Sequence, residues 1–471
     1  MSLDRPNILC IMADQFRVDY MGCAGAGFVR TPNLDRLAAR GVRFTNCASN
    51  SPLCVPARVG LATGLDPRRT GVVDNDLFLP PEYTTYYARL RDHGYRVGCV
   101  EKLDLAKPDE YNGCRGDRPR IFGWGFTHPV EVEGKEHSIK HPAPVGPYGF
   151  WLAGKGLYER YYAERQSRTW SERMWKPSEL PAETFLDSYQ GRRAVEWLKD
   201  IPQDFPWHLF VSFSGPHSPH DPPREYFERY ASAAMPAPVP IPADSRAGHL
   251  GPHIQALKDD PDLVANTRRS YCAYIELIDE WIGRILATLA ERRLEEDTII
   301  VFSSDHGEML WDLGMTGKSV PYEGSLRVPL IVAGAGIRAG ARCDALVELS
   351  DVNPTLCRLA GLPDQPGIDA RSFHHCLASP ELPHRVETVS DHRWWECIRT
   401  ADCKLVRYWN RLPEFYDLKT DPEERVNLYG EMQQKSPGRV SDMMRRLKAR
   451  RHTYNPCDGP REGFSGKAGP A

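Results

Sequence analysis

The alternation of strand-like runs with amphipathic stretches is the feature that most restricts how this chain can fold. The strand-like runs are typical of strands buried on both faces, and they are Asn7–Met12, Val42–Ala48, Tyr95–Val100, His208–Phe213, Thr298–Ser303 and Arg327–Ala333. Helical patterns stand between them, at Thr31–Gly41, Tyr83–His93, Glu183–Lys199, Asn266–Arg293 and Val352–Ala360. This order predicts an α/β fold with a large, mostly parallel sheet flanked by helices.

Two regions depart from the alternation. Residues 106–181 are crowded with Gly, Pro, Trp and Tyr, and they predict a long irregular excursion with a few short elements, a candidate for a pocket wall or lid. Near the C-terminus, Trp395–Thr400, Cys403–Tyr408 and Glu414–Leu418 predict an antiparallel sheet, with a helix near Val440–Arg451. A chain of 471 residues accommodates more than one unit. We therefore expect a large domain at residues 1–375 and a smaller α+β subdomain at 376–471.

Composition excludes several classes of protein. The net charge of -3 gives no reason to expect nucleic acid or an acidic membrane surface as a partner. The apolar start is too short for a signal peptide, and no run reaches the length of a transmembrane helix. The 13 cysteines are odd in number and scattered through expected strands and helices. Such a distribution favours reduced thiols and a cytoplasmic protein.

Polar residues follow four of the expected strands. Asp14, Lys102 and His217 each come after one strand, and Asp305 with His306 follow another. Ligands of open α/β sheets bind beyond the carboxyl ends of the strands, so these side chains are expected to converge on one site. Asp14, Asp305 and His306 suit a hard divalent metal. A lone Asp after a strand more often caps it, whereas adjacent ionisable residues after a buried run are costly unless they are used.

Cys54 opens a second pattern, Cys54-Val55-Pro56-Ala57-Arg58, that predicts a short helix. Pro56 suits a first helical position and Gly64 suits the stop. The thiol then lies at a helix N-terminus, which favours anions, and Arg58 adds a forked cation suited to an oxyanion. The alternatives are ordinary: Cys54 as an inert core thiol, Lys102 and Lys318 as solvated charges, and the histidines as structural.

The pattern around Cys54 resembles the Cys-x-Pro-x-Arg signature of the sulfatase family. The resemblance extends over most of the chain, through Arg5–Ile8 with Asp14, Thr31–Ala38, Gly41–Phe44, Ser304–Glu308, Gly317-Lys318, Tyr322-Glu323, Arg327–Pro329 and Phe415–Leu418 with Asp421-Pro422 and Asn427-Leu428. It implies an alkaline-phosphatase-like fold and hydrolysis of a sulfate ester of a small alcohol or phenol.

The resemblance also implies roles. Cys54 would be oxidised to formylglycine by a formylglycine-generating enzyme, and one hydroxyl of its hydrate would attack sulfur. The metal ligands would be Asp14, Gln15, Cys54, Asp305 and His306, holding one divalent ion, Ca²⁺ first and Mn²⁺ or Mg²⁺ otherwise. Arg58, Lys102 and Lys318 would balance charge, and His217 would contact the sulfate or protonate the leaving oxygen. His217 and His220 both fit the Pro-His-x-Pro pattern; we favour His217 and assign His220, with Asn75 and Asp104, to substrate binding.

Departures from the common family pattern narrow the choice of relatives. Asp14-Gln15, Asp305-His306 and Asp74-Asn75 resemble the branch of choline sulfatases and phosphonate monoester hydrolases, whose members are often oligomeric. The family's Gly-Lys-x-His block appears as Glu101-Lys102-Leu103-Asp104. A carboxylate there suits a diester-like monoanion or a substrate with a cationic group.

Three functions therefore remain open. The first is a sulfatase, the second a phosphonate monoester hydrolase or phosphodiesterase with the same machinery, and the third a catalytically inactive binding protein of the same fold. A small-molecule sulfate ester is the expected substrate, and a homo-oligomer is one possible state.

Overall fold

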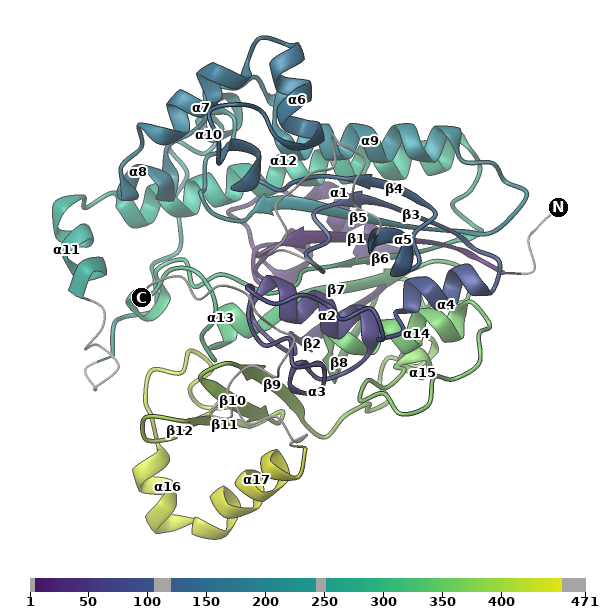
Figure 1. The fold of residues 1–471 in the computed structure, drawn as a ribbon. Helices are drawn as coiled ribbons and strands as arrows, with labels where there is room; N and C mark the ends of the chain where they lie inside the picture. The colour runs from purple at the N-terminus through teal and green to yellow at the C-terminus, as the bar shows by residue number, and fades with distance from the viewer. Residues whose placement is uncertain (1–4, 106–119, 243–250, 451–471) are drawn as a thin grey trace.

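An eight-stranded sheet forms the centre of the molecule (Figure 1), in the order β4-β3-β5-β1-β6-β7-β2-β8. The structure is a computed structural model and describes residues 5–105, 120–242 and 251–450. The strands are β1 Asn7–Asp14, β2 Gly41–Ala48, β3 Arg96–Glu101, β4 His128–Glu131, β5 Trp207–Pro216, β6 Thr298–Ser303, β7 Arg327–Ala333 and β8 Ala341–Glu348. Among these described strands, β7 alone runs antiparallel to its neighbours. The predicted α/β fold class is confirmed.

Helices cover both faces of this sheet (Figure 1). One face carries α1 (Pro32–Ala39), α9 (Leu186–Asp200) and α12 (Leu263–Glu291), and the other carries α2 (Cys54–Thr63), α4 (Tyr86–Asp92), α14 (Val352–Leu359) and α15 (His374–Ala378). Strand β1 shows why the sequences of the strands are continuously apolar: its alternate residues are buried in two different cores. Leu9 and Ile11 belong to the core of the first face, and Ile8 and Cys10 to that of the second.

Buried His208 on β5 makes the stability of this core depend on pH. Its Nδ1 lies 3.2 Å from the carbonyl oxygen of Ile8 and its Nε2 lies 3.3 Å from the Tyr86 hydroxyl. Burial lowers the pKa of His208 to about 3, and it lowers the pKa of His220 and of His392 to about 4. Each of these pKa values lies below that of a histidine in the unfolded chain. The contribution of the three histidines to the free energy of unfolding is therefore complete above about pH 6.5, and it is lost as the pH falls toward their pKa values in the folded protein.

We expect His208 alone to remove about 3 kcal/mol from the free energy of unfolding between pH 7 and pH 4. Urea titrations over this range measure the effect. A His208→Gln variant should show a shallower pH slope by about one proton, because it cannot charge in the unfolded state. Equal slopes in the two proteins would contradict this assignment.

The excursion is more regular than expected in its described part, residues 120–181. It contains strand β4 and the short helices α5 (Arg120–Gly123), α6 (Gly146–Gly154), α7 (Tyr158–Gln166) and α8 (Trp170–Trp175). Tyr148, Tyr158 and Tyr161 join the core cluster that also contains Tyr189 of α9. Burial of these aromatic rings in the core therefore stabilises α6 and α7, which show little helical periodicity of their own. Residues 106–119 of the predicted excursion lie outside the described residues.

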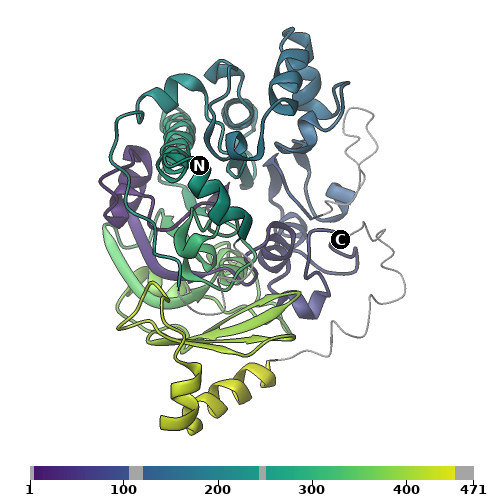
Figure 2. The same ribbon diagram turned by 90° about the vertical axis from the view of Figure 1, so that its left-hand side faces the viewer.

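A second, four-stranded sheet lies beside β2 and β8 (Figures 1 and 2). It is antiparallel, as predicted, in the order β12-β11-β10-β9. Its strands are β9 Thr388–His392, β10 Trp395–Arg399, β11 Cys403–Tyr408 and β12 Glu414–Asp417, and the helices α16 Tyr429–Lys435 and α17 Pro437–Ala449 pack on it. Strands β8 and β9 were not predicted. The domain boundary at residue 375 stays a prediction.

Shorter helices complete the described chain: α3 Pro67–Thr70, α10 Arg224–Glu228, α11 Gly251–Asp259 and α13 Glu323–Leu326. None of the helices in the described residues combines the length and the apolar character that crossing a membrane requires.

Candidate active site

Cys54 is the first residue of α2, so the helix begins two residues before Pro56, the predicted start. Its side chain is fully buried. The next backbone N–H, that of Val55, donates to Asn75 Oδ1 at 3.0 Å. The helix ends at Gly64, whose left-handed conformation (φ 72°) closes the last turn. Cys54 thus lies at the positive end of a buried helix, where negative charge is favoured.

The ends of β1 and β6 bring three further groups to Cys54. Asp14 is the last residue of β1, and Asp305 and His306 follow β6 after a single residue, Ser304. The Cys54 Sγ lies 3.3 Å from His306 Nε2 and 3.9 Å from Asp14 Oδ1. A carboxylate oxygen of each aspartate lies 3.7 Å from His306 Nε2. All four residues are buried, and one ligand atom from each lies within 4.8 Å of all the others.

Arg58 holds the two aspartates together. Its Nε donates to Asp305 Oδ2 at 2.9 Å and its Nη2 to Asp14 Oδ2 at 3.4 Å. Its Nη1 donates to the carbonyl oxygen of Lys102 at 2.7 Å and to Ser212 Oγ at 2.8 Å. Burial opposes the charge, but the two carboxylates raise the pKa of Arg58. Because its donors face the protein, Arg58 positions the carboxylates.

Two lysines add positive charge beside the same group. Lys102 Nζ donates to Asp14 Oδ2 at 2.5 Å. Lys318 Nζ donates to Cys54 Sγ at 3.1 Å and to Gln15 Oε1 at 2.8 Å. Burial and the nearby thiol would raise the pKa of Asp14, yet the charges of Lys102 and Lys318 help to hold it well below its usual range. Asp14 is therefore ionised at neutral pH and can ligate a cation.

Gln15, a predicted metal ligand, joins this group through Lys318 and through Glu308. Its backbone is left-handed (φ 68°), and its amide nitrogen donates to the Glu308 carboxylate. Glu308 Oε1 also accepts from the backbone N–H groups of Leu310, at 3.1 Å, and Gly317. Glu308 thereby fixes both Gln15 and the loop before Lys318. The motif Ser304–Glu308 contained this residue, but the sequence assigned it no role.

His217 and His220 lie in the turn after β5 but in different surroundings. His217 forms a side-chain hydrogen bond with Cys54; burial and the charge of Lys318 lower its pKa. Its Nδ1 lies 2.5 Å from the carbonyl oxygen of Ser218. His220 is 2% exposed, and its Nδ1 lies 3.0 Å from the carbonyl oxygen of Pro216 within its own turn. The structure thus brings His217 to Cys54 and holds His220 inside the turn.

Buried Asp221 anchors this histidine turn to the excursion. Lys135 and Arg165, both from residues 120–181, form ion pairs with its carboxylate, and Arg168 lies at 3.5 Å. Burial would raise the pKa of Asp221, but these cations lower it to about 2. Lys135 also donates to the carbonyl oxygen of Pro219. The excursion therefore supports the wall of the site that carries His217.

Asn75 and Asp104 complete the predicted set. Asn75 accepts the Val55 N–H at the start of α2, as described above, and Asp104 lies 3.3 Å from Lys102 Nζ. Arg393, in the turn between β9 and β10, forms an ion pair with Asp74 at 3.0 Å.

The β9–β10 turn also touches the opposite loop. Trp395 Nε1 donates to the carbonyl oxygen of Ser319, next to Lys318, at 3.0 Å. The neighbouring Trp394 is 57% exposed. The C-terminal sheet therefore borders the loop that carries Asn75 and the loop that carries Lys318, both of which contact the start of α2. The sequence did not predict this contribution.

The donor set fits a hard divalent cation. Two buried carboxylates and one imidazole converge on Cys54, and Gln15 adds an amide oxygen nearby. Oxygen-rich ligand sets of this kind suit Ca²⁺, Mg²⁺ or Mn²⁺, and conversion of the thiol to an oxygen-bearing group would strengthen the fit.

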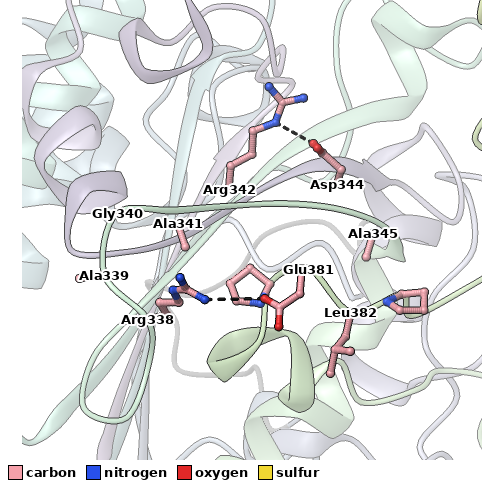
Figure 3. A pocket seen from close by; sticks show the side chains of 11 residues that line it. Arg338, Ala339, Gly340, Ala341, Arg342, Asp344, Ala345, Glu381 and Leu382 are labelled. Carbon is pink, nitrogen blue, oxygen red and sulfur yellow. Dashed lines mark hydrogen bonds and ion pairs between the residues drawn. The ribbon is translucent and has the colours of Figure 1, made fainter.

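A cavity of about 680 Å³ lies away from this group (Figure 3). It surrounds the start of β8, which runs parallel to β2, whereas β2 leads toward Cys54 at its other end. Its arginines are paired, Arg342 with Asp344 at 2.7 Å and Arg338 with Glu381 at 3.7 Å. None of the predicted site residues lines it.

The central sheet, together with the cluster of Asp14, Cys54, Asp305 and His306 at the carboxyl ends of its strands, defines an alkaline-phosphatase-like hydrolase. Residues 6–362 match the family model described as Sulfatase, and residues 312–453 match the model described as N-sulphoglucosamine sulphohydrolase, C-terminal. The chain belongs to the sulfatase family, which confirms the resemblance drawn from the sequence and assigns the chain to the sulfuric ester hydrolases.

Individual relatives agree with this assignment. The choline-sulfatase of Rhizobium meliloti is 31% identical over 450 residues, which cover 91% of this chain and 83% of that protein. The multifunctional alkaline phosphatase superfamily protein PehA of Trinickia caryophylli is 28% identical over 484 residues, 91% of this chain and 92% of that protein. The structure of the phosphonate monoester hydrolase of Agrobacterium radiobacter matches with a TM-score of 0.75 and 25% identity, covering 94% of this chain and 96% of that chain.

Proposed function

We propose that this chain hydrolyses the sulfate ester of a small organic alcohol or phenol, with formylglycine derived from Cys54 as its nucleophilic group. The observation that carries the proposal is the position of Cys54. Its Sγ lies within 4 Å of Asp14, His306 and Lys318, at the buried start of α2. A formylglycine-generating enzyme is the partner required for maturation. We place the protein in the cytoplasm, because every cysteine in the described residues is a free thiol.

Asp14, Asp305 and His306, with Gln15 as a further donor, would hold one divalent cation. We propose Ca²⁺ first, and Mn²⁺ or Mg²⁺ as alternatives. Such a cation, when bound, lowers the pKa of the attacking hydroxyl and neutralises charge on the sulfate oxygens.

The chain's own residues orient and neutralise the reacting groups. Arg58 keeps Asp14 and Asp305 fixed, through contacts of 3.4 and 2.9 Å. Lys318 Nζ lies 3.1 Å from Cys54 Sγ. In formylglycine an oxygen replaces this sulfur, and Lys318 would donate a hydrogen bond to that oxygen. Preorganised cations of this kind stabilise charge that develops in the transition state.

His217 would transfer the proton of the leaving oxygen. Its Nδ1 faces the Ser218 carbonyl and so carries a hydrogen, which leaves Nε2 as the nitrogen that gives or takes a proton. Burial and the charge of Lys318 lower the pKa of His217, which makes a proton on it easier to release.

We expect His217→Asn to lower kcat/KM more for alkyl sulfates than for 4-nitrophenyl sulfate. Alkoxides are poor leaving groups and need protonation, whereas 4-nitrophenolate does not. The loss should be about 10²- to 10⁴-fold for the alkyl esters and at least ten times smaller for the aryl ester. Steady-state kinetics on the two esters measure it, and equal losses would show that His217 does not donate this proton.

The second candidate is a phosphonate monoester hydrolase or phosphodiesterase. Gln15 and His306 beside the ligand aspartates favour it, as does the likeness to the Agrobacterium radiobacter structure. The test is a side-by-side assay of 4-nitrophenyl sulfate and a phosphonate monoester. A preference for the sulfate supports the first proposal, and a preference for the phosphonate by orders of magnitude overturns it. No turnover of either ester by protein carrying formylglycine would favour the third alternative, a binding protein.

A further inference from the structure

Asp104 is a carboxylate in a site that must bind an anion. Lys102 Nζ lies between two carboxylates, 2.5 Å from Asp14 Oδ2 and 3.3 Å from Asp104 Oδ2. The Asp104 side chain is 7% exposed. Its backbone is left-handed (φ 52°), a conformation that aspartate tolerates better than most residues but that still costs free energy. A strained, nearly buried negative charge in an anion site requires an explanation.

Holding Lys102 in place does not explain Asp104. Asp14 already binds the Lys102 ammonium at the shorter distance. The lysine stem is also confined by Gly134, where a Cβ would lie 3.0 Å from Lys102 Cδ. The charge of Asp104 reaches beyond Lys102, because it also raises the pKa of Arg58. Asp104 therefore acts on the electrostatic potential of the whole site.

Asp104 supplies one of the negative charges that compensate the cationic side chains of the site. Among the described residues, the cationic side chains that contact Asp14, Asp305 or Cys54 are Arg58, Lys102 and Lys318. Asp14 and Asp305 compensate two of these charges, and Asp104 compensates the third. The positive charge left to attract a substrate then comes from the bound divalent cation. Without Asp104 the site would carry one more positive charge and would favour more highly charged anions.

We propose that Asp104 sets the charge of the substrate, so that the site accepts esters whose transferred group carries one negative charge and rejects dianions. Sulfate monoesters and phosphonate monoesters belong to the accepted class, and phosphate monoesters above neutral pH belong to the rejected class. The inference rests on the proposed function and deepens it, because it distinguishes substrates by charge at the same site.

Kinetics of two variants test the proposal. Asp104→Asn removes the charge at nearly constant shape, and Asp104→Glu keeps the charge as a matched control. The substrates are 4-nitrophenyl sulfate, a monoanion, and 4-nitrophenyl phosphate, a dianion at pH 8. At a distance of several ångströms in a medium of intermediate dielectric, the charge of Asp104 repels a dianion twice as strongly as a monoanion. Removing it corresponds to a change of about 10- to 100-fold in the preference for the phosphate relative to the sulfate.

We expect Asp104→Asn to raise the ratio of kcat/KM for the phosphate to that for the sulfate by at least about tenfold, and Asp104→Glu to change it less than about threefold. If both esters lose activity equally in Asp104→Asn, the residue only positions Lys102 and the proposal is overturned.

Anion binding provides a readout that does not need turnover. Calorimetry on the Ca²⁺-loaded protein with the Cys54 thiol compares inorganic sulfate, a dianion, with methanesulfonate, a monoanion. Asp104→Asn should improve the affinity for sulfate relative to methanesulfonate by at least about tenfold. An unchanged ratio, or no binding of either anion to either protein, would contradict the inference. A wild type that binds these anions but hydrolyses no ester would instead refute the proposed function.

Discussion

Replacing Cys54 by alanine is expected to lower kcat/KM for an aryl sulfate by at least about 10⁴-fold, since the variant has no group that can become the nucleophile. The side chain is fully buried at the start of α2 and contacts His306 and Lys318. Its loss removes one sulfur atom and leaves the two aspartates paired with Arg58. The folded state should therefore remain, with a reduction in stability of about 1 kcal/mol.

Cys47 is the matched control for this substitution. It is a fully buried cysteine on β2, where burial and the nearby Asp351 and Glu348 raise the pKa of its thiol well above the ordinary value. Such a thiol is unreactive. Cys47→Ala should change kcat/KM less than about threefold. Sulfatase activity that survives Cys54→Ala would show that another residue attacks the ester.

Changing Asp305 to asparagine should have the second large effect, on both cation binding and activity. Asp305 accepts from Arg58 Nε at 2.9 Å and from the backbone N–H groups of Gln15, at 3.1 Å, and His306, at 3.0 Å. The asparagine side chain is uncharged and has only one acceptor oxygen, so it cannot accept all three of these bonds. It is also a weaker ligand of Ca²⁺ than a carboxylate. We expect a loss of at least about 10³-fold in kcat/KM and no rise in Tm on addition of Ca²⁺.

Asp391→Asn separates loss of a buried ion pair from loss of the cation. Asp391 pairs with buried Arg68 at 2.6 Å and is 5% exposed, so it is, like Asp305, a buried carboxylate paired with a buried arginine, but it does not belong to the ligand group. Both variants should lose about 3–5 kcal/mol of stability, because each leaves a buried arginine partly unpaired. Asp391→Asn should keep the Ca²⁺-dependent rise in Tm. A normal Ca²⁺ response in Asp305→Asn would contradict its assignment as a ligand.

The central sheet could be predicted because its strands are buried on both faces. Strand β1 shows this directly, since alternate residues enter the two opposite cores. Strand β8 escaped prediction because its first half is partly exposed and carries Arg342 and Asp344. The positions of α6 and α7 could not be predicted because burial of Tyr148, Tyr158 and Tyr161 in the core, rather than the periodicity of these helices, stabilises them.

The sequence also indicated which groups would meet at the site, because strand ends of a parallel sheet share one edge. Asp14, Cys54, Asp305 and His306 come together in the structure, while their catalytic roles stay predictions. The supporting contacts could not be predicted in the same way. Glu308 contacts Gln15, directly after β1, and Lys135 and Arg165 contact Asp221 from the excursion. No sequence spacing encodes these side-chain contacts.

The most direct test of the account is the sulfatase activity measured as a function of the fraction of Cys54 converted to formylglycine. Co-expression with a formylglycine-generating enzyme at different levels would yield preparations of different conversion, and peptide mass spectrometry would measure that fraction in each. The account predicts that kcat for 4-nitrophenyl sulfate is proportional to the converted fraction and extrapolates to zero for the thiol. Full activity in protein whose Cys54 is an unmodified thiol would contradict it.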